Sequence, residues 1–268
     1  MADLVNSQTH KKAECRRCGT CCRKGGPALH GPDAELLSGG ILRARDLCAF
    51  RAGELVRDET LERIVPLPGE LVKIAAPHGS RPDDWTCRFL TEKNLCFIHG
   101  TQPIECRAFY CEAPEALLAL SGKDSLDRKA VRALLKAPEW WDELMDAHAE
   151  HCAYDALTEL APRIADDAEA RRAFLEIVEY DRAFRELAVE KKAAQPDELD
   201  FLLGRPLLRT VIMYGLDARP QPDGGISLVQ TSRNVREELL ALCSAKNTLF
   251  FRGIALYPRR GKLSSPSH

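Results

Sequence analysis

The sequence predicts an α+β protein in which a loop-rich, metal-stapled N-terminal cysteine-cluster domain packs on a mainly helical C-terminal half with a small sheet. Eight of the 11 cysteines lie in two blocks within residues 15–111. Residues 1–112 contain long stretches without regular hydrophobic periodicity, whereas later segments carry apolar residues at helical spacing. We therefore expect a cysteine-cluster metal-binding domain over residues 1–112 and a mainly helical domain over residues 113–268.

Composition narrows the classes of protein to consider. The chain has 268 residues, 29% of them charged, and a net charge of −2, which predicts no general affinity for nucleic acid or anionic membranes. No apolar run approaches the roughly 20 residues that span a bilayer. The N-terminus has neither a basic start nor an apolar signal core, so we expect a cytoplasmic protein. An odd number of cysteines then favours metal or thiol chemistry over a disulfide framework.

The first cysteine block has the spacing C-x2-C-x2-C-C. Two residues between sulfurs let a tight loop turn two thiolates toward one ion or cluster. Nearby basic residues favour thiolate over thiol, although a solvated basic loop is the alternative interpretation. Side chains of adjacent residues diverge, so we expect one of the last two cysteines to serve this centre. The other would bridge, ligate a second centre or pack as a thiol. The block comprises Cys15, Cys18, Cys21 and Cys22.

The second block supplies further thiolates from residues 85–111, namely Cys87, Cys96, Cys106 and Cys111. Two short apolar runs around a polar turn predict a hairpin with Cys87 and Cys96 at its ends. A short helix is expected after Pro103, on which Cys106 and Cys111 would point in different directions. Either this helix ends before Cys111 or the two cysteines have different roles. Cys96 and His99 have a spacing that a zinc site uses, but we favour a turn-end role for the histidine.

This pattern resembles the YkgJ-like cysteine-cluster family, a zinc- or iron-chelating domain. The resemblance implies metal binding and leaves the reaction open. The flagellin lysine methylases have a similar cluster, thought to hold an iron–sulfur centre. Two positions depart from the family pattern, His99 in place of tyrosine and Gln102 in place of arginine. The matching residues are the eight cysteines together with Arg88, Phe89, Leu90, Leu95, Phe97, Ile98, Pro103, Arg107, Ala108 and Phe109.

Periodicity predicts the remaining elements. Cys48 has no partner at ligand spacing, so we interpret it as a small buried hydrophobe. His148 and Cys152 lie four apart on the apolar face of a helix; a metal pair is one interpretation, and core packing is the one we favour. Helices are expected over residues 33–37, 125–136, 139–160, 162–192 and 234–244, and strands over residues 70–75, 207–214, 226–230 and 249–256.

Three hypotheses follow for function. The first is a cytoplasmic metalloprotein that holds an iron–sulfur cluster, or else zinc or mononuclear iron, on thiolates of the two blocks. The second is an iron–sulfur-dependent group-transfer or redox enzyme related to the flagellin lysine methylases. The third is a structural zinc module for protein interaction. The chain shows no repeats, no phosphate-binding loop, no dinucleotide-binding glycine pattern and no nucleophile elbow, so the sequence assigns neither substrate nor partner.

Overall fold

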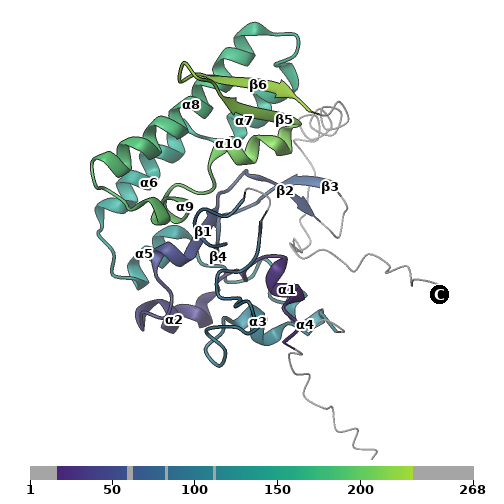
Figure 1. Cartoon of the computed structure of the whole chain (residues 1–268), viewed down its shortest axis with the longest axis vertical. Coiled ribbons are helices and arrows are strands. Elements are labelled where there is room, and N and C mark those ends of the chain that lie inside the picture. Colours follow the sequence, from purple (N-terminus) through teal and green to yellow (C-terminus); the bar gives the residue numbers. More distant parts are fainter. Residues whose placement is uncertain (1–16, 59–62, 82–83, 111–112, 232–268) are drawn as a thin grey trace, which may run out of the picture.

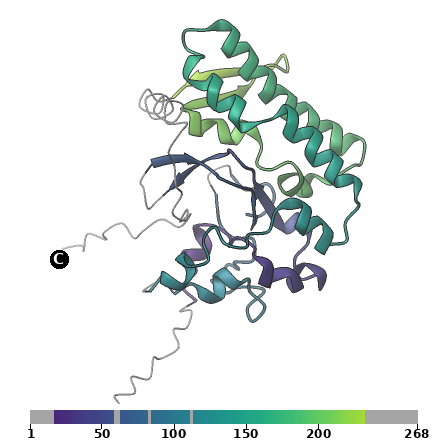
Figure 2. The same cartoon turned by 180° about the vertical axis from the view of Figure 1, so that it is seen from behind.

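The computed structural model describes residues 17–58, 63–81, 84–110 and 113–231. Within these ranges the chain is a mixed α+β protein whose helices are concentrated in the C-terminal half, as the sequence predicts. The elements α1–α4 lie toward one end of the molecule and the long helix α8 with the β5–β6 hairpin toward the other (Figures 1 and 2). The predicted helix over 234–244 and strand over 249–256 lie outside the described residues.

The N-terminal half contains short elements. Two antiparallel pairs form, β1 with β4 and β2 with β3. The strand expected over residues 70–75 is confirmed as β4, and the helix expected over 33–37 as α2, whereas the other three strands were not predicted. The elements are β1 (Leu47–Phe50), β2 (Leu55–Asp58), β3 (Arg63–Pro66), β4 (Leu71–Ile74), α1 (Thr20–Arg23), α2 (Ala34–Ser38), α3 (Ile104–Ala108) and α4 (Glu115–Leu118).

Strand β4 holds the segment that follows the first cysteine block. On the side away from β1, the Leu29 N–H donates to the Val72 carbonyl at 2.9 Å, and the Ile74 N–H donates to the Pro27 carbonyl at 3.0 Å. The approach is so close that a Cβ on Gly26 would lie 2.2 Å from the Ile74 carbonyl oxygen. Only glycine fits there without a shift of the backbone. The end of the first cysteine segment is therefore fixed against the sheet.

The C-terminal half is built from helices and one hairpin. The helix expected over 139–160 is interrupted: α6 ends at His151, Cys152 has a non-helical ψ of 40° and Ala153 is extended before α7 begins. The helix expected from Pro162 begins later, where the Asp167 carboxylate accepts the N–H groups of the first turn of α8. The elements are α5 (Arg128–Leu134), α6 (Trp140–His151), α7 (Tyr154–Leu160), α8 (Ala168–Glu190), α9 (Leu199–Leu202), α10 (Leu207–Thr210), β5 (Leu216–Pro220) and β6 (Ile226–Gln230).

One predicted strand is wrong. Residues 207–214 form α10 and a 3₁₀ turn, and the strand that pairs with residues 226–230 is instead β5. The apolar, β-branched run suggested a strand, but Leu207 and Val211, four apart, are both buried in the same core. Gly215, with a φ of 71°, ends the turn and lets the strand begin one residue later.

Two main cores fill the molecule. The first includes Leu29, Leu47 and Val72 from the N-terminal half together with Met145 and Phe201 from the helical half. The second lies among α7, α8, α10 and the β5–β6 hairpin. The first core therefore crosses the expected boundary at residue 112, and the division into two domains stays a prediction. In the described ranges, no helix is long and apolar enough to cross a membrane.

Candidate metal centre

The first cysteine block leads into helix α1, which carries Cys21 and Cys22. Their Sγ atoms lie 3.9 Å apart, and both residues are half-buried. Gly19 precedes the helix with a φ of 73°, a conformation that glycine adopts without strain. Cys18 is exposed, and its thiol contacts the Thr20 hydroxyl at 3.3 Å. Two sulfurs of the block thus face the body of the protein, and a third lies at its surface.

The second block is tied to the first by a backbone hydrogen bond. The Cys87 N–H donates to the Cys22 carbonyl at 2.7 Å. A tight turn follows, in which Leu90 and Cys96 form an isolated antiparallel bridge and Asn94 has a φ of 59°. This turn returns the chain so that Cys96 lies beside Cys87. The chain does reverse direction between Cys87 and Cys96, as predicted. It does so through a turn with a single bridge, however, and the two strands of a hairpin do not form.

Helix α3 brings Cys106 to the same place. The helix ends at Ala108, before Cys111, so the first of the two predicted alternatives is confirmed. Two buried carboxylates anchor its N-terminal end. Asp33 accepts the Ile104 N–H at 2.7 Å, and Glu105 accepts the Ala28 N–H at 2.7 Å. Because Ala28 follows the first block, these bonds hold Cys106 against that block.

Five of the predicted cysteines therefore converge. The thiol of Cys106 interacts electrostatically with those of Cys87, Cys96 and Cys21, and the thiol of Cys22 interacts with those of Cys87 and Cys106. Cys18 interacts with Cys21 from its exposed position. Cys15 and Cys111 lie outside the described residues. Cys48 is buried in a separate small core, as predicted.

The thiols differ in acidity. The hydrogen bond from Cys22 lowers the pKa of Cys21 to about 6, and the same contact raises the pKa of Cys22. Burial raises the pKa of Cys87 to about 11. Desolvation and the neighbouring thiols of Cys87, Cys96 and Cys21 raise the pKa of Cys106. One thiol of the Cys21–Cys22 pair thus ionises more readily than an ordinary cysteine, and a metal ion binding here would displace protons from the others.

The donor set fits a thiophilic metal. All five converging donors are sulfur, which suits zinc and iron–sulfur clusters. Among the described residues, no three of these sulfurs lie within 4.8 Å of one another. Four thiolates at about 2.3 Å around one tetrahedral ion would lie about 3.8 Å apart. Only the Cys21 and Cys22 sulfurs, 3.9 Å apart, are thus shown at the spacing of two ligands of one ion among the described cysteines.

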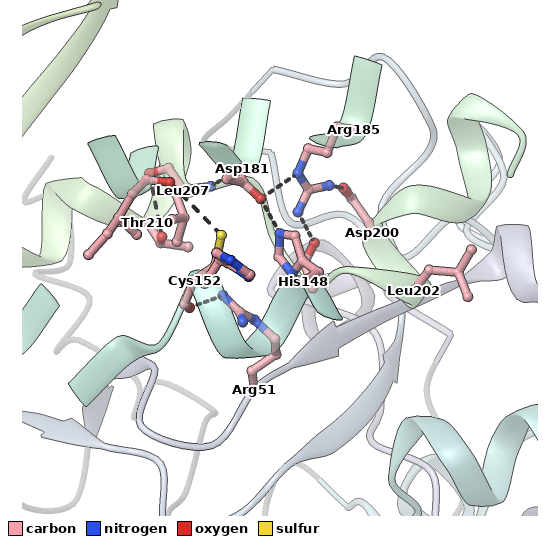
Figure 3. A network of polar contacts seen from close by, with 12 residues as sticks. Arg51, His148, Cys152, Asp181, Arg185, Asp200, Leu202, Leu207 and Thr210 are labelled. Atoms are coloured by element: carbon pink, nitrogen blue, oxygen red, sulfur yellow. Dashed lines mark hydrogen bonds and ion pairs between the residues drawn. The ribbon is translucent and has the colours of Figure 1, made fainter. Parts of the chain in front are cut away.

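A second group of ligand-type side chains lies in the helical half. The ligand atoms of His148, Cys152 and Asp181 all lie within 4.8 Å of one another, and all three residues are buried (Figure 3). The burial of the histidine and cysteine on the inner face of their helix was predicted, whereas the aspartate from α8 was not. In the sequence, Asp181 is marked by its charge among the apolar residues on the inner face of its helix.

The contacts of this group favour a structural network. The Asp181 carboxylate already accepts three N–H groups, from His148 Nε2 at 2.8 Å, Arg185 Nε at 2.9 Å and the Leu207 backbone at 2.8 Å. The guanidinium of Arg51 reaches the Cys152 carbonyl at 3.0 Å, which places a second cation beside the group. A metal ion would have to displace N–H donors from this saturated, ionised carboxylate next to two positive charges. We therefore interpret the network as a structural one that joins α6, α8 and the start of α10 (Figure 3).

The N-terminal geometry defines a class, a domain that presents a cluster of cysteine sulfurs to a metal. Residues 14–123 match the model of the CxxCxxCC family, described as "Putative zinc- or iron-chelating domain". The matched segment contains all eight predicted cysteines. The expected resemblance to a cysteine-cluster family is confirmed over this segment, and the family description supports a bound metal, zinc or iron. No curated protein and no solved structure matches the chain. The similarity to flagellin lysine methylases stays a prediction.

Proposed function

We propose that the N-terminal part of this chain holds an iron–sulfur cluster on cysteine thiolates of the two blocks. The observation that carries the proposal is the convergence of five sulfurs from α1, the turn after Cys87 and α3. The description of the matched family, zinc- or iron-chelating, supports the metal but leaves its identity open.

The spacing of the sulfurs favours a cluster over a single ion. A cluster is larger than one ion, so its thiolate ligands stand farther apart. The absence of any described trio of these sulfurs within 4.8 Å agrees with the larger group. Because thiols stay reduced in the cytoplasm, we place the protein there.

The proposed ligands come from both cysteine blocks. Cys87, Cys96 and Cys106 come from the second block, and one member of the adjacent pair Cys21 and Cys22 completes the described donors. The 3.9 Å contact lets either thiol of that pair donate to the other, so either can be the more acidic ligand. Cys15, Cys18 and Cys111 belong to the same predicted set. If all eight proved necessary, two centres would meet at the adjacent pair.

Anaerobic purification tests the proposal. We expect a brown protein with visible absorption, iron and acid-labile sulfide. Cys87→Ser and Cys106→Ser should each lose most of the iron, because one thiolate ligand is removed. Cys48→Ser is the matched control, since this buried thiol belongs to another core and should keep full metal. Colourless protein with stoichiometric zinc would replace the cluster by a structural zinc site. Full metal in both ligand variants would refute the ligand assignment.

A further inference from the structure

Strand β4 contains a lysine where its neighbours are apolar. Lys73 lies between Val72 and Ile74, yet only 9% of its surface is exposed. Its side chain shares a face of the sheet with Cys48, its direct cross-strand partner. The Nζ atom lies 5.7 Å from the centre of the Phe50 ring. A long cationic side chain thus runs through a buried layer instead of reaching solvent.

The ammonium lies where the cysteine-bearing segments meet. Its Nζ is 3.9 Å from the position that a Cβ of Gly25 would occupy, in the loop just after Cys22. The carbonyl oxygen of Trp85, two residues before Cys87, is 4.0 Å from that same position. The ammonium also interacts electrostatically with the carboxylate of Glu105, the residue before Cys106, and with the Cys87 thiol. It therefore lies near the loop that follows Cys22 and interacts with residues of the second block.

A neighbouring cation, Arg205, is half-buried and paired with a carboxylate. The guanidinium of Arg205 lies 4.4 Å from the centre of the Phe50 ring and is paired with the buried carboxylate of Glu54. The carboxylate facing Lys73 is shared. Glu105 also accepts the Ala28 N–H and contacts His30 Nε2 at 3.2 Å. The Glu105 carboxylate thus interacts with Lys73, His30 and the backbone that follows the first cysteine block.

A metal centre with four thiolates carries negative charge. Four thiolates around one zinc ion leave a net charge of −2, and a thiolate-bound iron–sulfur cluster is also anionic. We propose that Lys73 is the internal counter-charge of the metal centre, a positioning residue that raises the affinity of the cysteine cluster for metal. This inference rests on the proposed metal binding. It concerns the free energy of binding and assigns Lys73 no contact with the metal.

The test is metal affinity of the full chain with Lys73 neutralised. Lys73→Met and Lys73→Gln remove the charge and keep most of the side-chain volume, and Lys73→Arg keeps the charge. Lys93→Met is the matched control, because this exposed lysine in the turn between Cys87 and Cys96 is screened by water. The reduced proteins compete anaerobically for Zn²⁺ alone against a chromophoric chelator. We expect the neutral variants to bind on the order of tenfold more weakly, and the other two within about twofold of the unchanged protein.

The possible outcomes distinguish a failure of the proposed role of Lys73 from a failure of the proposed metal binding. Wild-type affinity in both neutral variants would overturn the role of Lys73 while leaving metal binding intact. No Zn²⁺ or iron binding by the unchanged chain would overturn the proposed function itself. Thermal unfolding of the metal-free variants provides the structural readout. A neutral variant that unfolds at lower temperature but binds metal normally would show that Lys73 only supports the fold. If Lys73→Met does not fold, the affinity of Lys73→Gln decides between these outcomes.

Discussion

The buried network of His148 predicts a loss of stability in mild acid. Burial, with help from Arg51 and Arg185, lowers the pKa of His148 from 6.5 to about 4, and the hydrogen bond to Asp181 only partly opposes this shift. The imidazole is therefore neutral in the folded protein at neutral pH. The unfolded chain takes up the proton first as pH falls below 6.5. Stability should thus decrease from about pH 6.5 to about pH 4 and be fully present above that window.

The size of the effect follows from the two pKa values. A shift from 6.5 to about 4, at about 1.4 kcal/mol per unit, gives about 3 kcal/mol. No discount for solvent is needed, because the side chains of His148 and Asp181 are 0% and 1% exposed. The pKa of Asp181 is about 2: burial opposes the shift, but Arg185 and His148 more than offset it. Its own contribution is lost only below 3.8, in a separate pH window.

Chemical denaturation followed by helix circular dichroism measures the effect. The full chain and the variant His148→Gln are unfolded at pH 7, 5.5 and 4.5. We expect the wild type to lose about 2–3 kcal/mol over this range relative to the variant, whose side chain does not titrate. His78→Gln, in an exposed loop, should follow the wild type. Equal pH dependence of wild type and His148→Gln would refute the reasoning. A zinc-dependent stability that His148→Gln abolishes would instead make the network a metal site.

Two further predictions concern the scaffold of the cysteine cluster. Gly26→Ala should lower stability by about 1–3 kcal/mol and reduce metal content, because its Cβ would overlap the Ile74 carbonyl oxygen; thermal unfolding and iron analysis measure this. Gly69→Ala, with open space around its Cβ, should change neither quantity. Metal removal by a chelator should expose residues 17–27 and 84–110 to limited proteolysis while α5–α8 stay protected, and an unchanged digestion pattern would contradict metal stapling.

Local spacing predicted the ligand-type residues, whereas tertiary contacts could not be predicted from it. The C-x2-C spacing of the first block identifies cysteines without knowledge of the fold. The hydrogen bond from Cys87 to the Cys22 carbonyl joins segments far apart in the sequence, so no local pattern contains it. In the sequence, Lys73 is marked as a single charge in an apolar strand. Its position near the cysteine-bearing segments, however, depends on the loop packed against β4. The strands β1–β3 have four residues each, as does the predicted β4, so alternation distinguishes such short strands from loops only weakly.

The scaffold under the cysteines is packed against the helical half of the protein. Strands β1 and β4 pack into the first core with Met145 and Phe201 of the helical half. The cysteine segments then attach to β4 through backbone hydrogen bonds, from the Ile74 N–H to the Pro27 carbonyl and from the Arg88 N–H to the Ala75 carbonyl, each at 3.0 Å. We therefore expect metal binding to order the sulfurs on this sheet and not to create the fold. This arrangement differs from a zinc finger, which is unfolded without its metal.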